Sequence, residues 1–271
     1  MIKAAYIAAQ GMMVQEKVTD TIANNIANAS TPAFKNRIAN SSDLSYQTER
    51  KAGSGMEDEG AFYPTGIQYG NGVSIANTAI DFSRGMPIGT EQTLDVRLED
   101  SNKNPSFFIV NLPNGDQAYT RSGNFSLDRD GRIVTVDGFV IDPETTINGT
   151  NDTIKIDYQG NIQYKELGQD DDEALTTAGQ FNIASFTNVG GLESIGHSLF
   201  KATYAVGDIT TGNAGDDNFP GVKIIQRSLE SSNTSTVKEM ANLIKAQQTY
   251  TFNSKVLNAS KQVTDDIIRI M

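Results

Sequence analysis

Apolar residues recur every three or four positions at both ends of the chain, the period of an amphipathic helix. Near the start they are Ile2, Ala5, Ala9, Met12, Val14, Val18, Ile22 and Ile26. Near the end they are Val237, Met240, Ile244, Phe252, Val256, Ala259, Val263, Ile267 and Ile270. The pattern predicts an N-terminal helix over residues 2–29, which stops at Thr31-Pro32 because the residue before proline avoids helical geometry. A C-terminal helix is predicted to follow the cap-forming segment SSNTST.

The C-terminal helix should be about 35 residues, or ~50 Å at 1.5 Å per residue, which is long for a small domain. We therefore expect the two terminal helices to pair with each other, antiparallel and like a coiled coil. Small residues keep the first helix thin and favour close approach: Ala4, Ala5, Ala8, Ala9, Gly11, Ala23 and Ala27. Packing of both helices under a sheet is the other interpretation that the period allows.

Short alternating segments fill the middle of the chain, separated by turn dipeptides. These dipeptides are Asn114-Gly115, Asp130-Gly131, Asp137-Gly138, Asn148-Gly149 and Gln159-Gly160. Asn-Gly and Asp-Gly between such segments are typical of β-hairpins. The later stretches GQFNIASFTN and VKIIQRSLE also indicate strands. The predicted fold is α+β, with the helix pair joined to a mainly antiparallel β domain.

Residues 36–75 fit neither pattern. ERKAGSGMEDEG is polar and carries glycine, whereas GIQYGNGVSIANTAI predicts one return strand. An extended arm is expected here. The organisation is then an N-terminal helix (1–34), an arm (35–75), a β-rich domain (76–235) and a C-terminal helix (236–271).

Composition narrows the function. The 271 residues include no cysteine, which excludes disulfides and thiolate sites, and the net charge of -11 argues against nucleic acid as a partner. The terminal segments are neutral and +2, which leaves -13 on residues 35–235. No apolar run reaches the roughly 20 residues of a membrane span, so no membrane insertion is expected. The start MIKAAYIAAQGMM resembles a weak leader, but its helical period continues through Ile26, so we predict no cleaved signal peptide.

Three segments could carry chemistry. Asp128-Arg129-Asp130-Gly131 begins like a calcium loop, but its glycine comes too early and a hairpin turn is favoured. The run Asp170 to Glu173 is interpreted as a solvated acidic loop. Ser194 lies near Glu193 and His197, yet the glycine of a nucleophile elbow is missing. No catalytic, cofactor-binding or metal-binding residue is therefore predicted. An enzyme would have to depend on His197, the only histidine, or on the acidic run.

The stretch TIANNIANASTPAFK places three asparagines in a predicted helix. Asparagine is roughly 0.5 kcal/mol worse than alanine there. Asn24 and Asn28 share a face, and either they are exposed or capping, or they set the register of a helical interface. Because a lone helix pair leaves apolar surface outside, we expect lateral association with further copies. The predicted subunit-interface residues are Ile22, Asn24, Asn25, Ile26, Asn28, Phe34, Ile244, Phe252, Val256, Val263 and Ile267.

Several of these segments resemble the bacterial flagellar rod and hook proteins. NNIANASTPAFK is similar to their N-terminal signature, and SSNTSTVKEMANLIKAQQTYTFNSKVLNASKQV to their C-terminal helix. LDV, FFIVNLPNGDQAYTRSGNFSLDRDGRIVTVDGFVI and GLESIG extend the resemblance from end to end. The stretch YQTERKAGSGMEDEGAFYPTGIQYGNGV and the length resemble distal-rod members more than the longer hook members. LEDSNKNPSFF departs from the family, because Asn104 and Pro105 replace an expected glycine-rich turn.

The resemblance implies a structural subunit of the distal rod, without cofactor. It would be exported unfolded through the flagellar secretion channel and would polymerise as a hollow helical drive shaft in the basal body, spanning the periplasm and carrying torque to the hook. The terminal helices would form its inner tube, the β domain its outer layer, and the arm would brace neighbouring copies. Partners would be further copies, proximal-rod, hook and bushing-ring proteins, and the export apparatus. Alternatives are a proximal-rod or hook paralogue, or a secreted β-rich binding protein or adhesin whose helices merely oligomerise.

Overall fold

The computed structural model describes residues 2–53, 62–100, 105–147, 154–165 and 175–270. It divides into two compact units, and the chain crosses between them more than once. The first unit contains Met1–Ala27, Arg37–Ala79 and Ser235–Met271, and the second contains Asn28–Asn36 and Ile80–Thr234. The first carries the helices and the second is built from strands, so the α+β prediction is confirmed.

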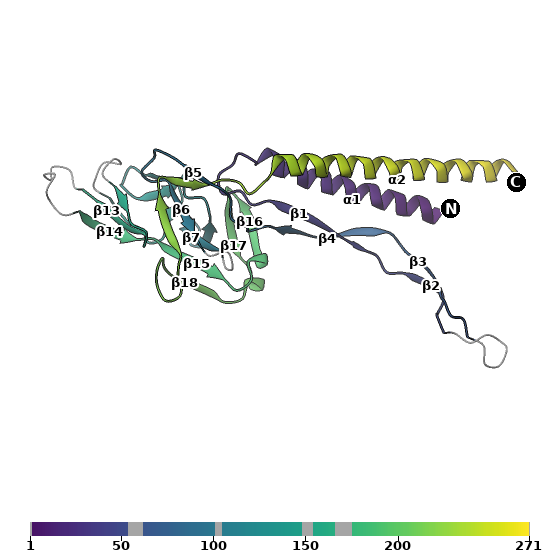
Figure 1. The fold of residues 1–271 in the computed structure, drawn as a ribbon, viewed down its shortest axis with the longest axis horizontal. Coiled ribbons are helices and arrows are strands. Elements are labelled where there is room, and N and C mark those ends of the chain that lie inside the picture. Colours follow the sequence, from purple (N-terminus) through teal and green to yellow (C-terminus); the bar gives the residue numbers. More distant parts are fainter. Residues whose placement is uncertain (1, 54–61, 101–104, 148–153, 166–174, 271) are drawn as a thin grey trace. The chain divides into compact units, whose positions relative to one another are not determined.

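Two long helices dominate the first unit (Figure 1). They are α1 (Ile2–Ala27) and α2 (Thr236–Ile270), which run antiparallel side by side as predicted. The 35 residues of α2 match the expected length. Helix α1 ends slightly before the predicted stop, because Asn28 begins a turn in which the Thr31 N–H donates to the Asn28 carbonyl at 3.1 Å.

The arm of the first unit is a pair of two-stranded ribbons. Strand β1 (Arg37–Asp43) pairs with β4 (Val73–Ile80), and β2 (Gln47–Arg50) pairs with β3 (Ile67–Tyr69). The prediction of one return strand was wrong, because Gly70-Asn71-Gly72 divides it. Gly72 has φ +107°, and its carbonyl accepts a bond from the Leu44 N–H at 2.9 Å, which holds the break in place.

The largest sheet of the second unit has nine strands in the order β16-β17-β8-β7-β11-β10-β9, with β15 on β7 and β18 on β15. Strands β12, β13 and β14 form a second sheet, and β6 pairs with β19 and β5 with β20. The strands are β5 (Pro87–Gly89), β6 (Val96–Glu99), β7 (Ser106–Asn111), β8 (Gln117–Thr120), β9 (Phe125–Leu127), β10 (Ile133–Thr135), β11 (Val140–Ile141), β12 (Lys155–Ile156), β13 (Asn161–Tyr164), β14 (Thr176–Gln180), β15 (Asn182–Phe186), β16 (Leu192–Gly196), β17 (Leu199–Ala202), β18 (Ile209–Asn213), β19 (Lys223–Gln226) and β20 (Ser228–Glu230).

Most predicted turns join antiparallel strands in this unit. Gly115, Gly131, Gly138 and Gly160 all have positive φ between such strands, as the dipeptides predicted, whereas Asn148-Gly149 lies outside the described residues. Successive side chains of a strand point to opposite faces. Phe107 and Phe108 of β7 accordingly enter two different apolar clusters, and both are fully buried. Strand β7 therefore connects the two halves of the core.

Four buried charged residues meet in the second unit. Glu230 accepts a bond from Lys35 at 2.6 Å and another from Arg121 at 3.1 Å, and Arg121 also pairs with Asp100 at 2.6 Å. The backbone is joined at the same place, because the Ala33 N–H donates to the Glu230 carbonyl at 2.8 Å. The cluster ties together residues that enter and leave the β unit.

Candidate assembly interface

Small and polar residues form the seam between the two helices. Helix α2 presents Glu239, Ala246, Asn253 and Ser260, spaced seven residues apart as in a coiled coil. Glu239, Ala246 and Ser260 are buried, and Asn253 meets Gly11 of α1 so closely that a Cβ on Gly11 would lie 2.6 Å from Asn253 Nδ2. The thin first helix thus permits the close approach that its small residues predicted.

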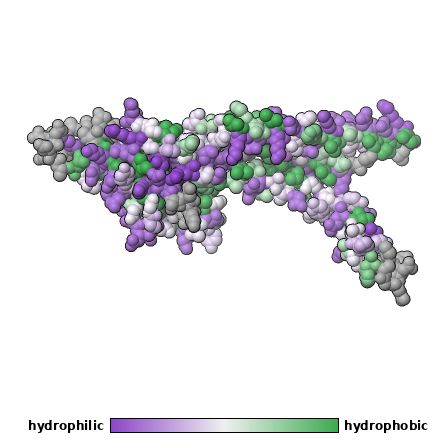
Figure 2. All heavy atoms as spheres, in the orientation of Figure 1, coloured by the Kyte–Doolittle hydropathy of each residue, from purple (hydrophilic) through white to green (hydrophobic). Residues whose placement is uncertain are grey.

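Large apolar residues of α2 are not buried in this seam. Each is substantially exposed: Ile244 55%, Phe252 61%, Val256 49%, Val263 40% and Ile267 45%. Figure 2 shows apolar residues scattered among polar ones on the surface of the helix pair. The helical period of the sequence therefore marks an exposed apolar stripe, and such stripes are typical of interaction sites. We call these five residues the outer stripe.

Asn25 is the most buried asparagine of the N-terminal stretch, at 1% exposure. Its Nδ2 donates to the Arg37 carbonyl at 2.8 Å, and the Arg37 N–H donates to its Oδ1 at 3.0 Å. Nδ2 also lies 3.5 Å from Glu239 Oε2. One amide therefore joins α1, the first arm strand and α2. The helical period of the sequence did not indicate this role. The low helix propensity of asparagine was a signal that position 25 has another purpose, but it did not identify Arg37 or Glu239 as the partners.

The other predicted N-terminal interface residues differ in exposure. Ile22 is buried, Ile26, Asn28 and Phe34 are half-buried, and Asn24 is exposed. Asn28 Oδ1 accepts a bond from the Thr31 hydroxyl at 3.2 Å, within the turn that follows α1. Ile22, Asn25 and Ile26 share the helical unit with the outer stripe, whereas Asn28 and Phe34 belong to the β unit.

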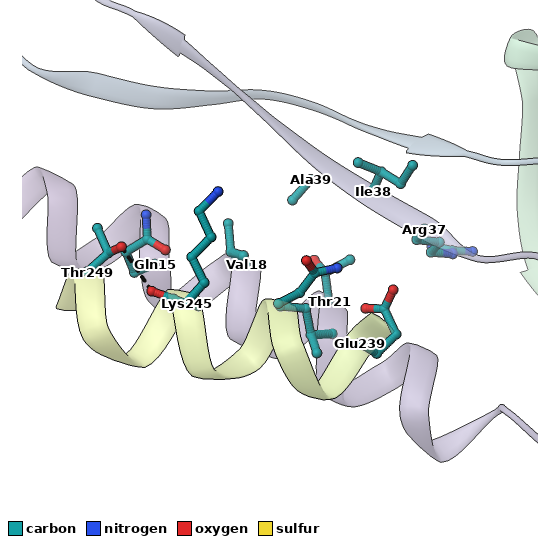
Figure 3. A pocket seen from close by; sticks show the side chains of 12 residues that line it. Gln15, Val18, Thr21, Arg37, Ile38, Ala39, Glu239, Lys245 and Thr249 are labelled. Carbon is teal, nitrogen blue, oxygen red and sulfur yellow. Dashed lines mark hydrogen bonds between the residues drawn. The ribbon is translucent and has the colours of Figure 1, made fainter. Parts of the chain in front are cut away.

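A cavity of about 280 Å³ lies between α1, α2 and β1 (Figure 3). The Lys245 side chain reaches from α2 toward the arm, and Glu239 extends from the same helix toward β1. The lining consists of Gln15, Val18, Thr21, Ile22, Arg37, Ile38, Ala39, Glu239, Asn242, Lys245, Ala246 and Thr249. We call this cavity the arm groove.

The residues that tempted a chemical interpretation have structural surroundings. His197 and Ser198 form a two-residue turn with positive φ, and His197 Nδ1 lies 2.8 Å from Asp137 Oδ1. Ser194 lies within β16. Asp128 begins the β9–β10 hairpin turn, as favoured, and Arg132 Nη2 lies 3.1 Å from its Oδ2. The acidic run 170–173 and Asn104 lie outside the described residues.

Two general findings concern the described part of the chain. No three His, Asp or Glu side chains gather there in a way that could hold a metal ion. No helix in those ranges is both long and apolar enough to cross a membrane.

Three segments of the chain match models of known protein families. Residues 6–35 match the family model "Flagella basal body rod protein", residues 104–164 the "Flagellar hook protein FlgE/F/G D1 domain", and residues 225–270 the "Flagellar basal body rod FlgEFG protein C-terminal". The first and last models therefore fall mainly on the two helices.

Full-length relatives support the same family. The flagellar basal-body rod protein FlgG of Caulobacter vibrioides is 38% identical over 97% of both chains. FlgG of Borreliella burgdorferi is 36% identical over 96% of this chain and 95% of its own. By contrast, the hook protein FlgE of Helicobacter mustelae matches only 52% of this chain and 30% of its own length, at 30% identity.

The chain belongs to the flagellar basal-body rod protein family, whose members are structural proteins. Within that family it is most like the distal-rod protein FlgG, because matches to FlgG proteins extend along the whole chain.

Proposed function

We propose that this chain is a structural subunit of the flagellar distal rod and that it polymerises through its helix pair into a hollow helical shaft. The observation that carries the mechanism is the outer stripe, five apolar residues exposed on a helix whose own seam is small and polar. Association between copies covers such a stripe, and contacts between different patches generate helical polymers when they do not close.

The parts of the chain take different roles in this proposal. The helical segments 1–34 and 236–271 form the inner tube, with Ile22, Asn24, Asn25, Ile26, Asn28 and Phe34 contributing beside the outer stripe. The β-rich segment 76–235 forms the outer layer, and the arm 35–75 braces neighbouring copies. The rod lies in the basal body and spans the periplasm, and the subunit reaches it through the export apparatus. Proximal-rod, hook and bushing-ring proteins are its partners, and it transmits torque to the hook.

Electron microscopy of purified full-length protein tests this proposal. Tubes are expected. Small closed oligomers alone would instead favour a β-rich binding protein whose helices only oligomerise. Removal of residues 1–30 or 240–271 should abolish tubes while the β unit stays folded by circular dichroism, and normal tubes from either truncated chain would refute the role given to the helices.

Substitutions on the outer stripe give a sharper test in the intact chain. Phe252→Ser with Val256→Ser changes only exposed side chains, so the isolated subunit should remain folded while tube formation is lost. The matched control is Gln247→Ser with Gln248→Ser, two exposed polar residues of the same helix. If the Phe252/Val256 variant still forms tubes, the outer stripe is not part of the interface between copies.

A further inference from the structure

Helix α2 continues past the beginning of α1. Asn25 lies against Glu239, and Gly11 lies against Asn253, the same number of residues apart on both helices. Continuing this register places Ile2, the first residue of α1, opposite Gln262. Residues 263–270 therefore extend beyond the described part of α1, as the longer free end of α2 in Figure 1 shows. We call residues 263–270 the overhang.

Within the described residues, the overhang carries an apolar face without a helix opposite it. Ile267 follows Ser260 by seven residues and continues the seam, yet it is 45% exposed, whereas Ser260 is buried. Ile268 and Ile270 are 67% and 85% exposed. Asp265 and Asp266 give the same segment two exposed negative charges. The overhang is thus a short amphipathic helix end that carries two acidic side chains and the basic Arg269.

The arm groove has the complementary properties. Val18, Ile22, Ile38 and Ala246 supply apolar lining, and Arg37 and Lys245 supply positive charge. Glu239 faces the same space at 4% exposure, and its carboxylate makes a single side-chain hydrogen bond among the described residues, the 3.5 Å contact with Asn25. The cavity has apolar walls, two basic side chains and one carboxylate with few hydrogen bonds. It is therefore suited to a helix end that has both apolar and charged side chains.

We propose that the overhang of one copy docks in the arm groove of the next copy. Ile267 and its apolar neighbours cover Val18, Ile22 and Ile38, while Asp265 and Asp266 face Lys245 and Arg37. The contact joins two different patches, so a row of copies keeps a free groove at one end and a free overhang at the other and can lengthen without closing. This inference rests on the proposed function and assigns it a lengthwise contact.

Cysteine cross-linking tests the contact, because the chain contains no cysteine of its own. Thr249→Cys places a thiol in the arm groove and Asp266→Cys places one on the overhang. The two positions lie ~26 Å apart along α2 at 1.5 Å per residue. A disulfide requires Cα atoms within about 7 Å, so any 249–266 link must join two copies.

Oxidation of assembled protein should give a ladder of covalent multimers on a denaturing gel, with 249–266 linked peptides in the mass spectrum. The matched control is Thr251→Cys with Asp266→Cys, because Thr251 is exposed outside the groove, and no 251–266 link is expected. Tubes from the Thr249/Asp266 variant without the 249–266 link would overturn the docking. A link confined to closed dimers would also overturn it.

Charge exchange supplies an independent test. Lys245→Glu alone, or Asp265→Lys with Asp266→Lys alone, should slow tube elongation by about tenfold or more, because like charges then meet across the contact. Lysine near a helix C-terminus favours the helix, so the second loss would not come from unfolding of α2. The three substitutions in one chain should restore elongation, whereas Lys261→Glu, on an exposed lysine outside the groove, should leave it unchanged.

The two failures are distinguishable. If every charge variant forms tubes at the rate of the wild type, the docking is refuted and the proposed function is unaffected. Wild-type protein that forms only small closed oligomers would refute the proposed function itself, and the lengthwise contact with it.

Discussion

The side-chain amide of Asn25 bonds both backbone groups of Arg37, through Nδ2 to the carbonyl at 2.8 Å and through Oδ1 to the N–H at 3.0 Å. This asparagine, which is a poor helix former, thus provides hydrogen-bond partners for the backbone N–H and carbonyl of Arg37, the first residue of β1. The contact is local in sequence yet joins a helix to a ribbon.

Replacing Asn25 by alanine should therefore loosen the start of the arm. Two part-buried backbone groups would lose their partners, at a cost of about 1–3 kcal/mol in the free energy of unfolding of this unit. Faster amide hydrogen exchange at Arg37 would report the loss. Asn24→Ala is the matched control, because Asn24 is exposed and should change exchange far less. Equal effects of the two substitutions would contradict the anchoring role.

Leucine at positions 24 and 28 tests the interface role of these asparagines. Asn24→Leu with Asn28→Leu should raise helicity by far-ultraviolet circular dichroism, because leucine is the better helix former at position 24, which lies within α1. It should also disorder tubes, because leucine does not specify register as asparagine does. Asn258→Leu, at an exposed site on α2, provides the control. Unaltered tubes from the double variant would return the two asparagines to exposed or capping roles.

Gly11 should be coupled to Asn253. Alanine favours a helix by about 1 kcal/mol over glycine, but its Cβ would lie 2.6 Å from Asn253 Nδ2. We expect Gly11→Ala to raise the free energy of unfolding when Asn253→Ala is also present. When Asn253 is kept, Gly11→Ala should raise it less or should lower it. A double-mutant cycle from urea unfolding measures this coupling. Additive effects would show that the helices have room at this point.

Glu230→Gln should be strongly destabilising to the β unit. The substitution leaves Lys35 and Arg121 buried with less negative charge, and breaking a buried ion pair from one side typically costs about 3–5 kcal/mol. Lys201→Met removes an ion pair of similar length, 2.6 Å, whose side chains are each 47% exposed, and it should cost much less. Urea unfolding of the two variants gives the comparison, and similar losses would show that burial does not govern the cluster.

The same cluster predicts a pH dependence. Burial lowers the pKa of Lys35 below its ordinary value of 10.5, although Glu230 opposes the shift. Between the lowered pKa and 10.5 the unfolded chain binds a proton that the folded chain has released, so stability rises with pH there. The free energy of unfolding of the wild type relative to Lys35→Met should therefore increase with pH across this window. Urea unfolding at several alkaline pH values measures it, and a constant or falling difference would contradict it.

Local patterns predicted most of the elements. The three-to-four period located both helices because they have one face partly covered, and the glycine dipeptides located hairpins because a positive φ is costly for other residues. The prediction from local patterns failed at Gly70-Asn71-Gly72. The strand-like pattern of the sequence continues on both sides of this segment, although the segment separates β3 from β4. Periodicity reports which residues share a face, and it does not report where pairing stops.

The seam and the ion cluster could not be predicted in this way. Apolar periodicity indicated the large residues of α2, but the covered face carries Glu239, Ala246 and Ser260. Ala246 and Ser260 are small, and Glu239 is buried where Asn25 gives it a polar contact. Lys35 and Glu230 lie far apart in the sequence, and each resembles an ordinary surface charge. Which distant residues meet depends on the packing of the whole unit, and a single sequence does not contain that information in any local pattern.

The bond between the Ala33 N–H and the Glu230 carbonyl brings the first segment of the β unit, Asn28–Asn36, beside the end of its second segment, Ile80–Thr234. Asn233 Nδ2 also donates to the Asp81 carbonyl at 2.8 Å, so the segment Ile80–Thr234 begins and ends at one place and is, in effect, an insertion in the helical unit. Segments whose two ends meet can be lengthened, shortened or exchanged with little effect on the remainder of the chain. Subunits with the same helices could accordingly carry outer parts of very different size, and one mode of assembly would serve many exteriors.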